Sequence, residues 1–151
     1  MTIGQTPITI IGNLTADPEL RFTPNGVPVA SFTVASTERR LNKETGKYDD
    51  GDTLFMRANL WRQDAENLCE SAVKGTRVIA SGTLKQRSYE TKEGEKRTVY
   101  ELQAEEVAVS LKWATVKISK AHRDKAPVPE DPWSDQAPPP SGPASNDEPP
   151  F

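Results

Sequence analysis

The chain has 151 residues, of which 34% are hydrophobic and 27% are charged, a length that suits one domain with a tail. Its single cysteine, Cys69, excludes an internal disulfide framework and favours a reducing compartment. No apolar run is long enough for a membrane helix, and the first residues lack the pattern of a signal peptide. We therefore expect a soluble cytoplasmic protein.

Residues 126–151 differ in composition from the rest of the chain. They hold nine of the 13 prolines and five acidic side chains, with no lysine or arginine. This tail carries a charge of −5, so the first 125 residues carry +2 although the whole chain stands at −3. The tail has too little apolar surface to fold, so we expect it to be disordered. The charge asymmetry predicts an anionic partner for the body and a different partner for the tail.

Alternating or β-branched apolar runs between turn residues predict strands along most of the body. A single helix is predicted at Asp64–Lys74, with Asp64 as its N-cap, Gly75 as its end and Cys69 as a small core residue on its buried stripe. The polar stretch 38–52 is predicted to be a long hairpin loop. The predicted strands are 8–14, 20–23, 27–37, 53–61, 76–89, 97–109 and 110–118.

The order of these elements predicts the fold class. One helix inserted among hairpin-linked strands, without βαβ alternation, argues against a parallel sheet. It favours an all-β protein, a five-stranded Greek-key barrel of the OB-fold type, with 110–118 as an extra C-terminal strand. Barrels of this type bind oligonucleotides on their surface and long loops.

The stretch 53–61 alternates strictly, which predicts a strand with two different faces. One face is apolar and suits a core. The other combines two aromatic rings with a cation and an amide, which suits a single nucleic-acid strand, because bases stack on rings and phosphates pair with cations. The alternative is a strand buried on both faces. The apolar face holds Leu54, Met56, Ala58 and Leu60, and the mixed face holds Phe55, Arg57, Asn59 and Trp61.

Two other strands add to this pattern. Lys85, Arg87 and Tyr89 share one face of strand 76–89, which gives a second basic and aromatic row. The predicted core face of strand 97–109 is Tyr100, Leu102 and Ala104, and the basic residues of the loops are Arg39, Arg40, Lys43, Lys47, Lys92, Lys96 and Arg97.

Catalytic chemistry has little support in the sequence. The single histidine, His122, has no partner nearby in the sequence, and one cysteine with one histidine makes neither a zinc centre nor a convincing nucleophile pair. No Walker loop, GxGxxG or GxSxG motif occurs. We therefore expect no enzymatic activity, no cofactor and no metal.

Several stretches of the sequence form a recognisable set. They are GNLTADPELRFTPNG at 12–26, VASFTVAST at 29–37, the 53–61 strand, SGTLKQRSY at 81–89 and NDEPPF at 146–151. This set resembles the bacterial single-stranded DNA-binding proteins, OB-fold tetramers that coat unwound DNA. SLKWATVKISKAHR at 110–123 is similar to the actinobacterial branch, or to a phage protein derived from it. The resemblance implies a homotetramer in which strand 110–118 clamps two subunits together.

The resemblance also implies roles for individual residues. The stacking aromatics of the family fall on Phe55, Trp61 and Tyr89, and Arg40 replaces a fourth, which is usually tryptophan in the best-known members. A guanidinium can stack on a base and pair with a phosphate, so binding need not be lost. Met56 falls where the family often has a histidine at a subunit interface, which implies an interface position for Met56.

The end of the chain resembles the acidic tip of the family, which docks onto replication, recombination and repair enzymes. A terminal ring and carboxylate suit a basic pocket, acidic neighbours steer the approach, and prolines lower the ordering cost. The expected domains are an OB-fold DNA-binding domain at 1–122, a disordered proline-rich linker at 123–145 and the tip at 146–151. The partner-binding residues are Asp147, Glu148, Pro149, Pro150 and Phe151.

These observations lead to one hypothesis and one alternative. The hypothesis is a non-catalytic homotetramer in the nucleoid that binds and protects single-stranded DNA, without sequence preference, in replication, recombination and repair. The alternative is an OB-fold interaction module for protein or RNA partners without strong binding of single-stranded DNA. The predicted DNA-binding residues are Phe55, Trp61, Tyr89, Arg40, Arg57, Lys85 and Arg87.

Overall fold

The computed structural model describes residues 3–121, so the predicted linker and acidic tip lie outside the described residues. Within 3–121, no helix is long and apolar enough to cross a membrane. The elements are β1 (Pro7–Leu14), β2 (Glu19–Phe22), β3 (Pro28–Leu41), β4 (Tyr48–Trp61), α1 (Gln63–Ser71), β5 (Arg77–Glu90) and β6 (Lys96–Val109).

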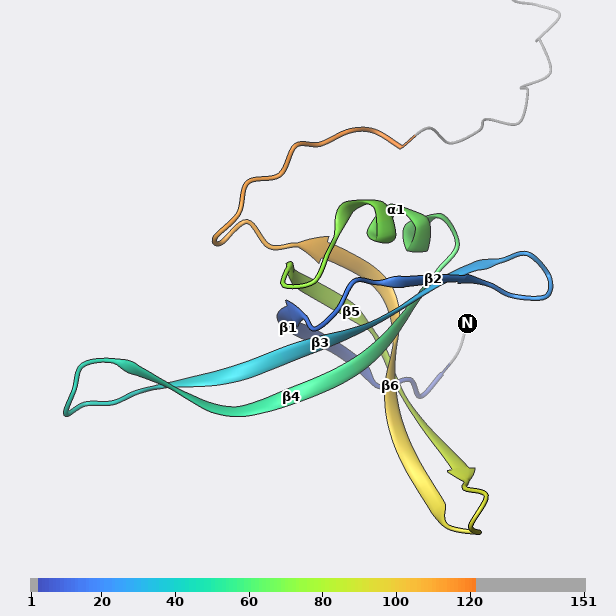
Figure 1. The fold of residues 1–151 in the computed structure, drawn as a ribbon, viewed down its shortest axis with the longest axis horizontal. Coiled ribbons are helices and arrows are strands. Elements are labelled where there is room, and N and C mark those ends of the chain that lie inside the picture. Colours follow the sequence, from blue (N-terminus) through green and yellow to red (C-terminus); the bar gives the residue numbers. More distant parts are fainter. Residues whose placement is uncertain (1–2, 122–151) are drawn as a thin grey trace, which may run out of the picture. The chain divides into compact units, whose positions relative to one another are not determined.

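The strands form one curved sheet in the order β1-β5-β6-β4-β3-β2, and β1 also pairs with β3 to close a barrel (Figure 1). The closing contact joins Asn13 to Ala35 and Leu14 to Val34. Only β4 and β6 run parallel among the pairs in the described region. Five strands (β1, β3, β4, β5 and β6) thus form the predicted Greek-key barrel of the OB type, and β2 adds a short edge.

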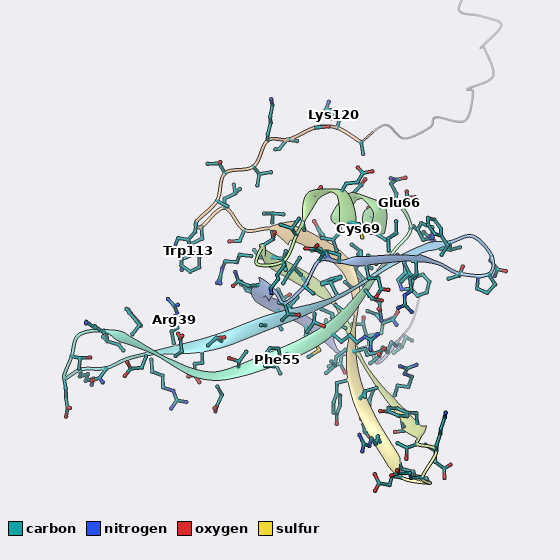
Figure 2. The ribbon with its side chains drawn as sticks, in the orientation of Figure 1. Arg39, Phe55, Glu66, Cys69, Trp113 and Lys120 are labelled. Carbon is teal, nitrogen blue, oxygen red and sulfur yellow. The ribbon has the colours of Figure 1, made fainter. Side chains whose placement is uncertain are left out.

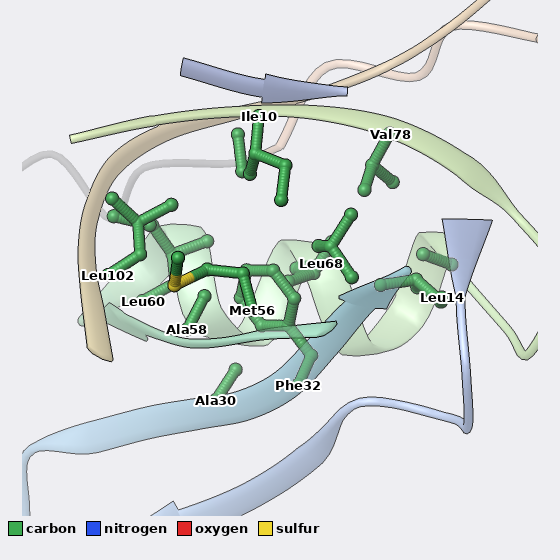
Figure 3. Packing of buried hydrophobic residues seen from close by; sticks show 14 of the residues in the cluster. Ile10, Leu14, Ala30, Phe32, Met56, Ala58, Leu60, Leu68, Val78 and Leu102 are labelled. Carbon is green, nitrogen blue, oxygen red and sulfur yellow. The ribbon is translucent and has the colours of Figure 1, made fainter. Parts of the chain in front are cut away.

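The barrel is filled by alternate residues of its strands, with α1 closing one end (Figure 3). Leu102 of β6 and Val78 of β5 have no exposed surface, and Leu68 of α1 is 6% exposed. The rest of the buried apolar cluster is Ile10, Leu14, Ala30, Phe32, Val34, Met56, Ala58, Leu60, Ala65, Ala72, Ala80 and Ala104.

Two glycines permit close approaches that the barrel requires. A Cβ atom on Gly12 would lie 2.2 Å from the carbonyl oxygen of Ala35, where β1 meets β3. A Cβ on Gly82 would lie 2.0 Å from the carbonyl oxygen of Gln103, beside the bulge between Ser81 and Gly82. Any side chain at either position would push the strands apart.

The helix is shorter than predicted. It begins after Arg62, which has a positive φ of 64°, and no side chain caps it, so Asp64 is not the N-cap but lies in the first turn. It ends at Ser71, and Gly75 occupies a later turn with a φ of 87°. Cys69 is half-buried against the core, and burial raises the pKa of its thiol, which disfavours the reactive thiolate.

Two hairpins extend beyond the barrel as two-stranded arms (Figure 1). The β3–β4 arm comprises residues 36–41 and 48–54, and the β5–β6 arm comprises 85–90 and 96–101. The stretch 38–52 is therefore mostly paired strand, and only 42–47 forms the turn. Both faces of an arm meet solvent, so Leu54 and Tyr100 are each 55% exposed instead of lying in the core as predicted.

The predicted strand 110–118 does not form in the single chain. The segment runs irregularly after β6, and within residues 3–121 its backbone is joined to a strand by one hydrogen bond, from the N–H of Ser110 to the carbonyl oxygen of Arg77 at 2.9 Å. Its alternation still leaves apolar side chains in solvent: Leu111 is 67%, Trp113 68%, Val116 48% and Ile118 89% exposed.

Candidate nucleic-acid interface

The outer face of β4 carries the predicted aromatic and basic residues. Phe55 is 65% exposed and Trp61 is 40% exposed, while Met56, Ala58 and Leu60 point into the core. The strand is therefore not buried on both faces. Pleating alone separates the two sets, because successive side chains of a strand point to opposite faces.

A row of polar side chains crosses this outer face at the middle of the sheet. Thr33 of β3 lies opposite Arg57 of β4, Arg57 lies beside Glu101 of β6, and Glu101 lies opposite Lys85 of β5. Residues paired in this way project from the same face. The Glu101 carboxylate thus has one predicted cation on each side, Arg57 and Lys85.

The β5–β6 arm forms a hollow of about 540 Å³ with β4. Phe55 and Arg57 line it from β4, Arg87 and Tyr89 line it from β5, and Glu101 lines it from β6. Figure 2 shows Phe55 on β4, near the point where the strand leaves the barrel. The structure therefore brings four of the seven predicted residues together around one space.

One cation of this hollow, Arg87, is bound to a carboxylate. Arg87 donates from Nη2 to Oε1 of Glu101 at 3.2 Å, and the Glu101 side chain is only 15% exposed. Within residues 3–121, Arg57 and Lys85 have no carboxylate within 4.0 Å. Their charges are thus available to an anion, while the exposed rings of Phe55 and Tyr89 are available to stack on bases.

Trp61 lies at the other end of the same face. Six residue steps along the strand separate it from Phe55, which is about 20 Å. It lines a second hollow of about 510 Å³ together with Thr23, Asn25 and Arg62. The β4 face therefore presents aromatic rings at both ends, with Arg57 and Asn59 between them.

Arg40 lies apart from both hollows, on the β3–β4 arm. Its Nε and Nη2 donate to Oε1 and Oε2 of Glu38 at 3.2 and 3.0 Å. This contact lowers the pKa of the Glu38 carboxyl and raises the pKa of Arg40, in both cases mainly through the hydrogen bond. The guanidinium is thus already occupied by a carboxylate of its own strand.

The remaining basic residues are spread over the arms. Arg39 pairs with Asp50 at 3.1 Å, and Arg97, which lies opposite Tyr89, pairs with Glu95 at 3.5 Å. Lys96 begins β6, and Lys43, Lys47 and Lys92 lie at the two hairpin turns.

The sequence reasoning missed three residues of the hollow, Val99, Tyr100 and Glu101. Tyr100 follows the core alternation of Leu102, but it lies on the arm, beyond the last core layer. Glu101 was detectable only from the pairing of β6 with β4, which no local pattern predicts. Met56 is 8% exposed and lies in the core of the single chain, as the alternation of 53–61 predicts, and its position at a subunit interface stays a prediction.

Among residues 3–121, no three side chains of the metal-binding types gather as a candidate metal site. The predicted partner-binding tip lies outside the described residues.

Comparisons with known proteins agree with this geometry. The model of the Single-strand binding protein family matches residues 6–110. Single-stranded DNA-binding proteins from Mycobacterium tuberculosis and Mycolicibacterium smegmatis are 61% and 58% identical over 120 residues, which cover 80% of this chain and 73% of each relative.

A solved structure is similar as well. The crystal structure of a small single-stranded DNA-binding protein from Streptomyces coelicolor aligns with a TM-score of 0.65 and 28% identity. The alignment covers 72% of this chain and 97% of that one. The family model spans the whole barrel with both arms, and the curated relatives share more than half of the aligned residues. The chain therefore belongs to the single-strand binding protein family.

Proposed function

We propose that the chain binds single-stranded DNA without sequence preference and protects it during replication, recombination and repair. The observation that carries the proposal is the hollow beside β4, where the exposed rings of Phe55 and Tyr89 stand next to Arg57 and Arg87. Every base has a face that can stack on a ring, so such a site tolerates any sequence. This role is binding without catalysis.

The same surface explains why a single strand fits better than a duplex. The rings lie on an open sheet face and reach only bases that are not already stacked in a helix. The described region projects no recognition helix, because its one helix, α1, packs against the core. Cations beside the rings add phosphate contacts, whose strength falls with salt through counterion release.

The test is a titration of the full-length protein with dT, dC and duplex oligomers at two salt concentrations. We expect tight binding of both single strands, weak binding of the duplex, and affinity that falls as salt rises. Preference for the duplex would contradict the proposal. Equal affinity for an RNA oligomer would instead favour the alternative of an RNA module.

We also propose that the tip 146–151 recruits partner enzymes. Its support is the composition of the tip, two acids and two prolines followed by a phenylalanine. Deleting residues 147–151 is expected to leave DNA affinity equal or slightly higher, because an anionic competitor is removed, while pull-down of replication enzymes fails. Retained pull-down would reduce the tail to a spacer.

A homotetramer is the proposed assembly, with segment 110–118 as a contact between subunits. The support is the exposure of Val116 and Ile118, since exposed apolar side chains are costly in a soluble monomer. The double variant Val116→Ser with Ile118→Ser should lower the mass measured by light scattering or the melting temperature of the assembly. An unchanged mass and melting temperature would reject this contact.

A further inference from the structure

A second group of cations surrounds an aromatic ring outside the β4 face. Trp113, in the segment after β6, is 68% exposed. The guanidinium carbon of Arg77 and the Nζ of Lys112 each lie 4.9 Å from the centroid of its ring. Figure 2 shows Trp113 on the side of the β3–β4 arm that carries Arg39. The contact with Arg77 of β5 thus places the ring beside the barrel, and the contact with Lys112 is local to the segment.

These residues line a hollow of about 370 Å³, together with Arg39 and Asp50. Asp50 is paired with Arg39 at 3.1 Å. Within the described chain, Arg77 and Lys112 have no carboxylate within 4.0 Å, and the buried Nε of Arg77 has no hydrogen-bond partner. The hollow is therefore lined by three cationic side chains and one acidic side chain. Two of the cations, Arg77 and Lys112, contact the ring of Trp113 but no carboxylate.

The register of the barrel connects this hollow to the β4 face. Phe55 lies opposite Ala35, Ala35 lies opposite Asn13, and Asn13 lies opposite Arg77. Paired residues project from the same face, so the four positions form one row around the outside of the barrel. Three strand spacings separate its ends, which is about 14 Å along the surface.

We propose that Arg77, Lys112 and Trp113 form a second contact site for single-stranded nucleic acid, beside the subunit contact that we assign to Val116 and Ile118 further along the same segment. A single-stranded nucleic acid that leaves the Phe55 hollow and crosses β3 reaches this site. There the two cations bind a phosphate, and an adjoining base stacks on the exposed ring. The inference rests on the proposed function. It adds a second route for the nucleic acid, across the barrel strands, to the route along β4. A polyanion fits better than an apolar partner, because the charges around the ring are uncompensated.

The test compares short and long dT oligomers bound by full-length variants. An oligomer of about 6 nucleotides fits within one surface of an OB fold, whereas one of about 35 nucleotides exceeds it. The variants are Trp113→Ala and Lys112→Gln, both at exposed positions. Lys117→Gln is the matched control, since it removes the same charge from the same segment and lies outside the hollow.

We expect every variant to bind the short oligomer as the wild type does. For the long oligomer, Trp113→Ala should lose at least about fivefold in affinity. Lys112→Gln should lower the slope of log affinity against log salt by about 0.7, and Lys117→Gln should not. Wild-type affinity and slope for the long oligomer in both variants, with short-oligomer binding intact, would overturn the proposal.

Other results would assign the hollow to another occupant. If Trp113→Ala abolishes binding of the free peptide SNDEPPF but leaves long-oligomer binding unchanged, the hollow holds the acidic tip and the proposal is wrong. A smaller mass by light scattering with unchanged DNA binding would assign it to a second copy of the chain. Failure of the wild type to bind even the short oligomer would contradict the proposed function itself.

Discussion

The two hairpin arms carry similar side chains but hold them differently. On the β3–β4 arm, Arg39 and Arg40 are each paired with a carboxylate whose side chain is more than half exposed. On the β5–β6 arm, Arg87 forms an ion pair with Glu101, whose side chain is mostly buried. Tyr89 of the same arm lines one hollow together with Phe55 of β4.

The difference shows that basic composition does not by itself make a binding surface. The β3–β4 arm has two arginines but faces its own acids, so an anion must first displace a carboxylate. The β5–β6 arm places Arg87 and Tyr89 around one hollow with β4, and Arg57 and Lys85 have no acidic partner within 4.0 Å in the described chain. We therefore expect DNA affinity to depend on the second arm far more than on the first.

The largest expected effect is the loss of an aromatic ring from the hollow or the β4 face. Phe55→Ala, Tyr89→Ala or Trp61→Ala should each weaken binding of a dT oligomer by more than about tenfold, because one stacking contact contributes roughly 1–3 kcal/mol. Fluorescence anisotropy of a labelled oligomer measures the loss. Circular dichroism checks that the fold is retained, as expected for exposed residues. Tyr48→Ala, which removes an exposed ring at the tip of the other arm, is the matched control.

A smaller effect is expected from single cations, and it separates the two arms. Arg57→Gln should lower the salt slope of dT binding by about 0.7, because one phosphate contact is lost. Arg40→Gln should leave the slope unchanged, since its guanidinium is bound by Glu38. Titrations at four or five salt concentrations provide both slopes. An equal fall in the two variants would show that the arms contribute alike.

The smallest effect, of opposite sign, is expected from Glu101→Gln. The variant removes the only carboxylate that lines the hollow and frees Arg87, so affinity for dT should rise about two- to fivefold, the size of one exposed ion pair. Glu95→Gln, which frees the exposed Arg97 at the tip of the same arm, should change affinity less. If Glu101→Gln weakens binding, the carboxylate positions Arg87 instead of competing with phosphate.

Sequence reasoning predicted the barrel and the β4 face because both depend on strict alternation. Inside a closed barrel every second side chain must be buried. The apolar residues Met56, Ala58 and Leu60 could therefore be predicted as core, with Phe55 and Trp61 on the outer face. The same rule failed at Leu54 and Tyr100, where the strands continue as arms with two solvated faces. Alternation says which residues share a face, but not how far the core extends.

Other features of the fold and the site could not be predicted from local sequence patterns, for different reasons. The contact between Glu101 and Arg87 depends on the register of β5 against β6, and the hollow depends on how the arm approaches β4. The alternating run 110–118 was predicted to be a strand, but a strand needs backbone partners along its length, and within residues 3–121 the segment has only the bond from Ser110 to Arg77 of β5. The pairing of Arg40 with Glu38 was foreseeable, since residues two apart share a strand face.

The most direct test of the account is a map of where DNA touches the protein. A dT oligomer carrying a photoactivatable uracil can be cross-linked to the full-length protein, and the modified peptides can be identified by mass spectrometry. We expect cross-links at Phe55, Tyr89 and Trp61. Cross-links confined to residues 38–50 of the β3–β4 arm, with none on β4 beyond Leu54 or on β5, would contradict it.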